Sequence, residues 1–232
     1  MPLRRWIRST NFAVEGILHG TKTQRHLRYH LYSAAFIMIV SYVLGISKID
    51  FLIITLTVIL VLLAELSNTA IEAVVDMVSP EHNEKAKIAK DVAAGGVLTT
   101  AFGAAVIGYI IILPYIRKAF QEGFHIAKHS GEEVSVMAVV LVLILVVMTK
   151  AHFGKGTPLR GGIPSGHAAL AFSVWVAVIY TASSTIVSSL CFVLAAGIAA
   201  SRVIWKIHTV WEVLLGGIMG AALTFVLFQI FF

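Results

Sequence analysis

Hydrophobic residues run along the chain in seven long segments separated by short polar breaks. About 20 consecutive apolar residues span the ~30 Å hydrocarbon layer of a membrane as a helix, and an unpaired strand cannot satisfy its backbone there. The pattern therefore predicts an all-α integral membrane protein with about seven transmembrane helices. The apolar segments are 29–47, 51–77, 91–114, 133–149, 168–182, 185–204 and 209–231.

Composition agrees with a membrane protein, since 58% of the 232 residues are hydrophobic and 13% are charged. A soluble domain of this length needs more polar side chains to cover its surface. The net charge of +6 favours contact with anionic lipid or phosphate over nucleic acid, because little soluble surface remains. The single cysteine, Cys191, excludes an internal disulfide.

The N-terminal stretch MPLRRWIRSTNF is basic and lacks the apolar core of a secretory signal. We interpret it as an amphipathic arm on a membrane surface. Lys and Arg gather before the first apolar segment, whereas the next turn carries only Lys48, and this bias predicts a cytoplasmic N-terminus. Counting spans then predicts that 79–90, 150–167 and 201–209 are cytoplasmic as well.

Four polar side chains in the second apolar segment stand at i, i+3, i+7 and i+11, on one face of a helix. They are Glu65, Asn68, Glu72 and Asp76. An ionised carboxylate at the bilayer centre costs roughly 2.5–3.5 kcal/mol, so this stripe is expected to face a bundle interior. With Lys90-Asp91 at the next helix start, it suits a nucleotide phosphate with bound Mg²⁺. The alternative is a polar seam that only joins helices.

The run ELSNTAIEAVVDMVSPEHNEKAKIAKDVAAGGVLTTA (65–101) resembles the signature of the prokaryotic diacylglycerol kinase and undecaprenol kinase family. The resemblance extends from about Ala13 to Pro114. It implies a three-span membrane kinase, usually a homotrimer, that uses MgATP to phosphorylate a lipid alcohol. It also implies Glu65 as general base, Glu72 as metal ligand, and Asn68, Lys90 and Asp91 around the nucleotide phosphates.

One position departs from that family. A second metal-binding glutamate usually precedes the first span, and Gln24 in TQRHLRYH stands in its place. A neutral amide is a poorer Mg²⁺ ligand than a carboxylate. The first half is therefore either an active lipid kinase or a non-catalytic scaffold.

The breaks at 150–167 and 201–209 carry residues suited to phosphate chemistry. His208 and Glu212 are four apart, so on a helix the carboxylate reaches the imidazole and fixes its tautomer, which makes a competent nucleophile. His167 is a candidate proton donor, and Gly166 at a helix start offers backbone N–H groups to an anion. A cationic clamp for phosphate is expected from Lys150, Lys155, Arg160 and Arg202.

Each of these residues also has a structural interpretation. Thr209-Val-Trp-Glu212 matches a capping box, which alone would explain Glu212 as a helix start. Lys and Arg near helix ends also anchor to lipid head groups.

The motifs PSGH (164–167) and SR-x5-H-x3-E (201–212) resemble the second and third signatures of the type 2 phosphatidic acid phosphatase superfamily. The resemblance covers about 133–231 and implies a metal-independent hydrolase. His208 would attack phosphorus to form a phosphohistidine, Glu212 would orient it, and His167 would protonate the leaving group. The phosphoryl oxygens would be bound by lysine, Ser165, Gly166 and Arg202.

Two departures from this superfamily affect the site. The third signature usually ends in aspartate, and Glu212 is one methylene longer. The first signature lacks its arginine, because counting from Lys150 the register reaches Thr157-Pro158. Lys155 and Arg160 are candidates to replace the missing cation.

The two resemblances together predict a fusion: a kinase-like domain of three helices (1–115), an interfacial linker (116–132) and a four-helix phosphatase-like bundle (133–232). They imply MgATP for the first half and no cofactor for the second. Phosphorylation of undecaprenol and hydrolysis of undecaprenyl diphosphate both yield undecaprenyl phosphate, so we expect a bacterial inner-membrane enzyme with this product. The alternatives are a phosphatidic acid-type phosphatase with a scaffold half, or a transporter, which lacks support from any Gly- or Pro-broken pair of spans.

Overall fold

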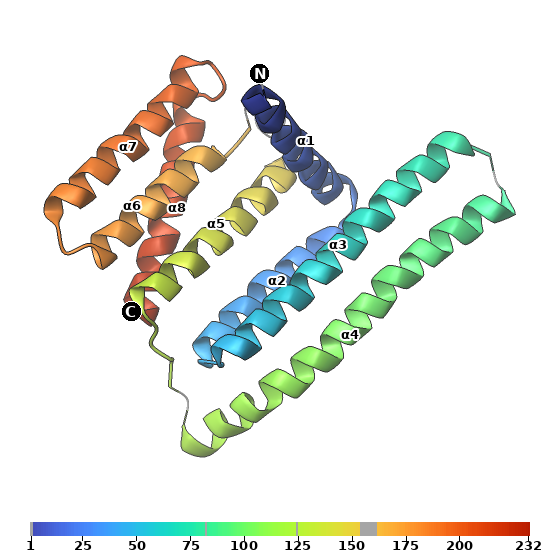
Figure 1. Ribbon diagram of the computed structural model, residues 1–232, viewed down its shortest axis with the longest axis horizontal. Helices are drawn as coiled ribbons and strands as arrows, with labels where there is room; N and C mark the ends of the chain where they lie inside the picture. Colours follow the sequence, from blue (N-terminus) through green and yellow to red (C-terminus); the bar gives the residue numbers. More distant parts are fainter. Residues whose placement is uncertain (1, 82, 124, 154–161) are drawn as a thin grey trace. The chain divides into compact units, whose positions relative to one another are not determined.

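The computed structural model describes residues 2–81, 83–123, 125–153 and 162–232 (Figure 1). All regular structure in these residues is α-helical, which confirms the all-α class. The helices are α1 (Pro2–Thr23), α2 (Arg25–Val43), α3 (Lys48–Val78), α4 (Glu84–Glu122), α5 (Gly131–Phe153), α6 (Gly166–Thr181), α7 (Thr185–Ile204) and α8 (Val210–Phe231).

Five of the described helices, α3, α4, α5, α7 and α8, are long and apolar enough to cross a membrane. The chain is therefore a multi-pass membrane protein. The predicted count of seven spans is not confirmed, because α2 and α6 fall outside this group. α6 is apolar but only 16 residues long, and the first turns of α2 carry Arg25, Arg28 and His30.

The helices group into two units of internal contact. Thr23–Ala127 forms a three-helix unit of α2, α3 and α4, and the chain up to Lys22 joins Lys128–Phe232 in a five-helix unit of α1, α5, α6, α7 and α8. α1 thus groups with the C-terminal helices, although the predicted kinase-like domain included it. Residues 116–122, the first part of the predicted linker, continue α4, and α4 ends where Gly123 takes a positive φ of 89°.

A polar clasp holds the start of α3 against α4 in the three-helix unit. Ser47 caps α3 by accepting the backbone N–H of Asp50 at 3.1 Å. The Tyr115 hydroxyl of α4 donates to Asp50 Oδ2 at 2.7 Å and accepts the backbone N–H of Ser47 at 3.0 Å. Buried Ile46, Ile54 and Ile112 pack around this end, so the turn between α2 and α3 is fixed on α4.

The five-helix unit is built on close packing between α6 and α8. A Cβ on Gly216 of α8 would collide with the backbone carbonyl of Ser165, the residue before α6, and a Cβ on Gly220 would collide with that of Ala169 in α6. Small residues at such positions let two membrane helices approach closely. The hydroxyls of Ser173 and Thr224 hydrogen-bond between the same helices at 2.7 Å, fully buried. The close packing of α6 against α8 fixes the Pro-Ser-Gly-His turn beside the first turns of α8.

We predict that Gly220→Ala destabilises the protein by about 1–3 kcal/mol, because the added methyl group forces α6 and α8 apart. The matched control is Gly197→Ala on α7, where nothing lies within 4 Å of the added Cβ. That variant should be neutral or slightly stabilising, since alanine has the higher helix propensity. Thermal unfolding in detergent, followed by circular dichroism, compares the two; equal effects would contradict the packing argument.

Candidate active sites

Glu72 of α3 is the centre of a hydrogen-bond cluster in the three-helix unit. The side-chain amide of Asn68 donates to Glu72 Oε1 at 2.9 Å, and that of Gln24 donates to Glu72 Oε2 at 3.3 Å. Gln24 is the residue before α2, and its side chain does not cap that helix, so it reaches α3. The amide that replaces the expected glutamate therefore contacts the candidate metal ligand directly.

The oxygen atoms at this cluster suit a weakly held Mg²⁺. Asn68 Oδ1 is buried and has no hydrogen-bond partner within the described residues, and it lies on the side chain that bonds to Glu72. Mg²⁺ is commonly bound by one or two carboxylates together with substrate phosphates. No group of three or more His, Cys, Asp or Glu side chains able to hold a metal occurs in the described part of the chain. The residues present thus fit an ion that depends on nucleotide phosphates for its remaining ligands.

Glu65, two turns before Glu72 on the same face of α3, pairs with a histidine that was not predicted from the sequence. Glu65 is 4% exposed, and His30 Nε2 of α2 lies 3.2 Å from its Oε1. His30 and Glu65 are far apart in sequence, so no local motif links them. The only indication of His30 in the sequence was a polar residue in an early turn of α2.

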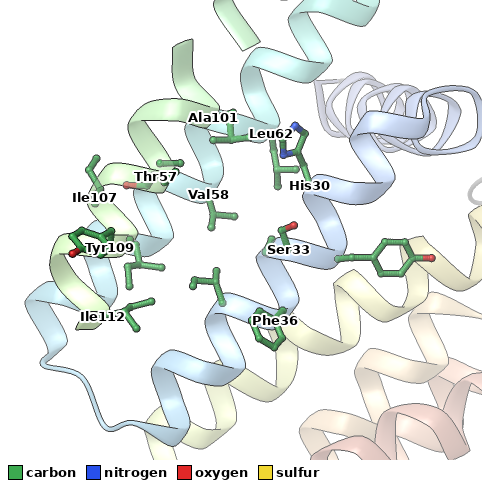
Figure 2. A pocket seen from close by; sticks show the side chains of 18 of the residues that line it. His30, Ser33, Phe36, Thr57, Val58, Leu62, Ala101, Ile107, Tyr109 and Ile112 are labelled. Carbon is green, nitrogen blue, oxygen red and sulfur yellow. The ribbon is translucent and has the colours of Figure 1, made fainter. Parts of the chain in front are cut away.

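His30 also lines a mostly apolar cavity of about 750 Å³ between α2, α3 and α4. Figure 2 shows His30, Leu62 and Ala101 toward one end of this cavity and Phe36 and Ile112 toward the other. The cavity therefore has His30, the partner of Glu65, toward one end, and its walls are mostly apolar. These properties match those of an alcohol with a hydrocarbon tail.

The remaining residues predicted around the nucleotide are less closely assembled. Lys90 at the start of α4 forms an ion pair with Asp76 at the end of α3. Asp91 is exposed, and no hydrogen bond joins it to the Glu72 cluster in the described part of the chain. The structure thus brings Asn68 and Glu72 together, whereas Lys90 forms its ion pair with Asp76.

In the five-helix unit, His208 lies in the turn between α7 and α8. Lys206 takes a positive φ of 53° there, and the backbone N–H of His208 donates to the carbonyl of Arg202 at 3.1 Å. His208 Nδ1 lies 2.9 Å from Glu212 Oε2, and the residue is 6% exposed. A carboxylate accepts the Nδ1 proton, which leaves Nε2 unprotonated and able to act as a nucleophile.

Glu212 both caps α8 and orients the imidazole. Its Oε2 accepts the backbone N–H of Thr209 at 3.0 Å, while Thr209 Oγ1 accepts the backbone N–H of Glu212 at 3.3 Å, which completes a capping box. Its Oε1 accepts the backbone N–H of Gly162 at 3.2 Å. The two interpretations of Glu212 from sequence are therefore compatible, because a carboxylate has enough lone pairs for all three partners.

Burial lowers the pKa of His208 below its ordinary value of 6.5, and the hydrogen bond with Glu212 opposes this shift. Lys150 and Arg202 lower the same pKa further through their positive charges. The imidazole is therefore neutral at pH 7, which is the protonation state that a nucleophile needs.

The Pro-Ser-Gly-His turn lies beside this pair. The backbone N–H of Ser165 donates to the carbonyl of Glu212 at 2.9 Å. Ser165 Oγ is completely buried and has no partner within the described residues, so it is available to an oxygen of a bound anion. Gly166 begins α6, where free backbone N–H groups also favour an anion.

Basic side chains lie near the same histidine–carboxylate pair. His167, in the first turn of α6, interacts electrostatically with Arg202, His208 and Lys150. Lys150 is 6% exposed, near the end of α5. Lys155 and Arg160 lie outside the described residues. The structure thus assembles a histidine–carboxylate pair, a second histidine and two cations from α5, α6, α7 and α8.

Two family models match the chain, one on each side of residue 115. Prokaryotic diacylglycerol kinase matches residues 11–112, and the PAP2 superfamily matches residues 120–232. The chain is a fusion of these two families. It therefore belongs to membrane enzymes that modify lipids. The diacylglycerol kinase match includes α2, α3 and most of α4, and the PAP2 match includes α5–α8.

Curated relatives match the kinase half. An undecaprenol kinase of Bacillus subtilis is 37% identical over 112 residues, which is 48% of this chain and 91% of that protein. A diacylglycerol kinase of Synechocystis sp. is 38% identical over 107 residues, 46% of this chain and 61% of that protein. A diacylglycerol kinase of Haemophilus influenzae is 32% identical over 85 residues, 37% of this chain and 72% of that protein. No solved structure matches the chain.

The pKa direction of His208 predicts the acid limit of hydrolysis at the PAP2 site. The neutral ring is the reactive form and its pKa is below 6.5, so kcat/KM should be maintained as the pH falls to 6.5 and decline only below that value. Glu212→Gln removes the carboxylate that raises this pKa, so the acid limb should move to lower pH. The rate should also fall by roughly 10²–10⁴-fold, because the imidazole loses its orienting group. Phosphate release from a lipid phosphate, measured against pH, tests both effects; an acid limb above pH 6.5 in the unmodified protein would contradict them.

Proposed function

We propose that the PAP2 half removes one phosphate from undecaprenyl diphosphate through a phosphohistidine, and that the kinase half phosphorylates a lipid alcohol with MgATP. The observation that carries the phosphatase is the buried His208–Glu212 pair at 2.9 Å beside the Ser165 turn. A kinase and a phosphatase for one lipid would consume ATP without net product. Acting on undecaprenol and undecaprenyl diphosphate, the two halves instead give the same product, undecaprenyl phosphate.

Hydrolysis proceeds in two displacements in this proposal. His208 Nε2 attacks the terminal phosphorus, and the bond from phosphorus to the bridging oxygen breaks as His167 protonates the departing oxygen. Water then cleaves the phosphorus–nitrogen bond, which releases inorganic phosphate and restores His208. Arg202 and Lys150 supply positive charge, and Ser165 and Gly166 supply hydrogen-bond donors, for the oxygens of the transferring group.

In the kinase half, Glu65 takes the proton from the lipid hydroxyl while the hydrocarbon tail lies in the cavity between α2, α3 and α4. His30, 3.2 Å from Glu65, holds that carboxylate in place. Glu72 and Asn68 would hold Mg²⁺, which neutralises charge on the nucleotide phosphates when bound. In this proposal Lys90 and Asp91 lie around the phosphates of the same nucleotide.

The proposal also includes an arrangement in the membrane. α2 and α6 complete seven spans, the N-terminus lies in the cytoplasm of a bacterial cell with the protein in its inner membrane, and three copies assemble through the kinase half. In sequence, 1–115 is the kinase-like domain, 116–132 the linker and 133–232 the phosphatase domain.

A second candidate function keeps the phosphatase and makes the kinase half a scaffold. The observation that favours it is the Gln24 amide, which occupies Glu72 Oε2 where a second carboxylate is expected. In this case the phosphatase would act on phosphatidic acid-type lipids without a partner reaction.

The central test is release of inorganic phosphate from undecaprenyl diphosphate by the purified protein. Release should persist in EDTA, because the proposed nucleophile is an imidazole, and His208→Ala should abolish it. The control is His125→Ala, which changes an exposed histidine next to the end of α4. Rapid hydrolysis of phosphatidic acid with no attack on the diphosphate would refute the substrate, and a His208→Ala variant with a near-normal rate would refute the nucleophile.

Gln24→Glu tests the kinase half. A second carboxylate beside Glu72 should tighten the apparent Mg²⁺ affinity by roughly tenfold, about 1.4 kcal/mol, and increase ATP-dependent phosphorylation of undecaprenol. Gln121→Glu, on the exposed end of α4, adds the same charge elsewhere and should have no effect. The measurement is transfer of labelled phosphate to the lipid. No transfer by either the unmodified protein or the Gln24→Glu variant would support the scaffold.

A further inference from the structure

Among the described residues that line the cavity of the three-helix unit, His30 has the side chain best suited to accept a proton. It lies toward one end of this cavity of about 750 Å³ (Figure 2). An imidazole gains and loses a proton near neutral pH, whereas a hydroxyl group does not. The other polar side chains of the lining all carry hydroxyl groups: Tyr32, Ser33, Thr57 and Tyr109. A lipid hydroxyl in the cavity therefore has the imidazole of His30 as its proton acceptor on the wall.

Glu65 does not line the cavity, although it is the partner of His30. Its side chain is 5% exposed, against 26% for that of His30. Glu65 Oε1 lies 3.2 Å from His30 Nε2, and no further hydrogen bond or ion pair joins either side chain to the described part of the chain. The contacts that connect the cavity with the carboxylate therefore pass through the imidazole.

The pairing with Glu65 sets the roles of the two ring nitrogens of His30. A carboxylate beside Nε2 favours the tautomer with the proton on Nε2, because an N–H group can donate to it. Nδ1 is then the acceptor, and within the described residues no hydrogen bond occupies it. The ring can therefore take a proton at Nδ1 while it gives one to Glu65 from Nε2.

The same seam between α2 and α3 relates His30 to the candidate metal ligand. α2 contacts α3 through Gln24 with Glu72 and through His30 with Glu65. Glu72 lies two turns beyond Glu65 on the same face, about 10 Å along α3. The end of the cavity that contains His30 is therefore the end nearer to the proposed nucleotide phosphates.

We propose that His30 is a catalytic residue of the kinase half, which binds the lipid hydroxyl through Nδ1 and passes its proton to Glu65. This inference rests on the proposed kinase function and adds a proton carrier between the substrate and Glu65. The lipid O–H bond breaks as Nδ1 gains the proton, and the Nε2 proton moves to Glu65 Oε1.

The rest of the step balances the proton and the electron pair. The freed electron pair of the lipid oxygen forms the bond to the terminal phosphorus of the nucleotide, and the bond from that phosphorus to its bridging oxygen breaks. Glu65 then returns its proton to Nε2 of His30, and Nδ1 releases its proton to water. Both side chains are thereby restored.

His30→Gln distinguishes proton transfer from simple positioning of Glu65. The amide nitrogen of glutamine donates to the carboxylate as Nε2 does, but the amide does not accept a proton near neutral pH. The variant should phosphorylate undecaprenol roughly 10²–10⁴-fold more slowly, with little change in KM for ATP. His26→Gln makes the same change at an exposed histidine of α2 and should match the unmodified protein. Transfer of labelled phosphate to the lipid is measured for the full chain in detergent.

A second variant, His30→Ala, tests whether an external base can replace the ring. Added imidazole should raise its rate by about tenfold, because part of the general-base contribution returns. It should not raise the rate of His30→Gln, since the glutamine side chain occupies the space of the ring.

Nitrogen NMR of the full chain labelled at histidine gives a measurement that needs no turnover. The probes are farnesol, a short polyprenol, and farnesene, which lacks the hydroxyl group. Farnesol should shift the Nδ1 resonance of His30, which is identified by its absence from the His30→Gln spectrum, and farnesene should leave it unchanged.

The outcomes separate this role from the kinase function itself. A near-normal rate in His30→Gln overturns proton transfer through the ring and leaves Glu65 as a direct base. A folded His30→Ala variant that gains nothing from imidazole, or equal shifts with farnesol and farnesene, overturns the proposal as well. A shift specific to farnesol, in a protein that phosphorylates no lipid alcohol, supports the hydroxyl contact and refutes the kinase function.

Discussion

The PAP2 site depends on one carboxylate. Glu212 joins three pieces of chain: its side chain holds the His208 ring and the backbone of Gly162, and its backbone carbonyl holds Ser165. It also begins α8 through the capping box with Thr209. Because the same carboxylate caps a helix and holds the proposed nucleophile, the geometry of the candidate site is tied to the helix end itself.

The rest of that half keeps these pieces in register. Gly216 and Gly220 let the backbone of α8 contact that of α6, which carries the Ser165 turn at its start. The two glycines therefore set the distance between the Ser165 turn, the proposed phosphate-binding element, and His208, the proposed nucleophile.

The sequence predicted much of this arrangement, for reasons that are physical. Long apolar runs can only be helices in a membrane, and the spacing of His208 and Glu212 requires contact once a helix starts between them. These interactions join residues that are close together in sequence, so they could be predicted from the sequence alone. The spans of α2 and α6 were harder to count, since polar residues in the first turns of α2 and the short length of α6 weaken the hydropathy signal.

Contacts between residues far apart in sequence could not be predicted from the sequence alone. His30 meets Glu65 across two helices, and no local pattern links them. The capping box of Glu212 and its contact with His208 were read as alternatives, because a linear motif does not show that two oxygens serve different partners. The grouping of α1 with the C-terminal helices has no counterpart in the motifs, which assign that segment to the kinase.

That grouping changes how the chain is assembled during synthesis. α1 is synthesised before the three-helix unit, whereas the helices with which it groups are synthesised after that unit. The kinase-family helices are thus an insertion within a discontinuous unit, and a contact of this sequence separation forms late. A cut at the boundary between the two family matches would therefore separate α1 from the helices with which it groups and leave the five-helix unit incomplete.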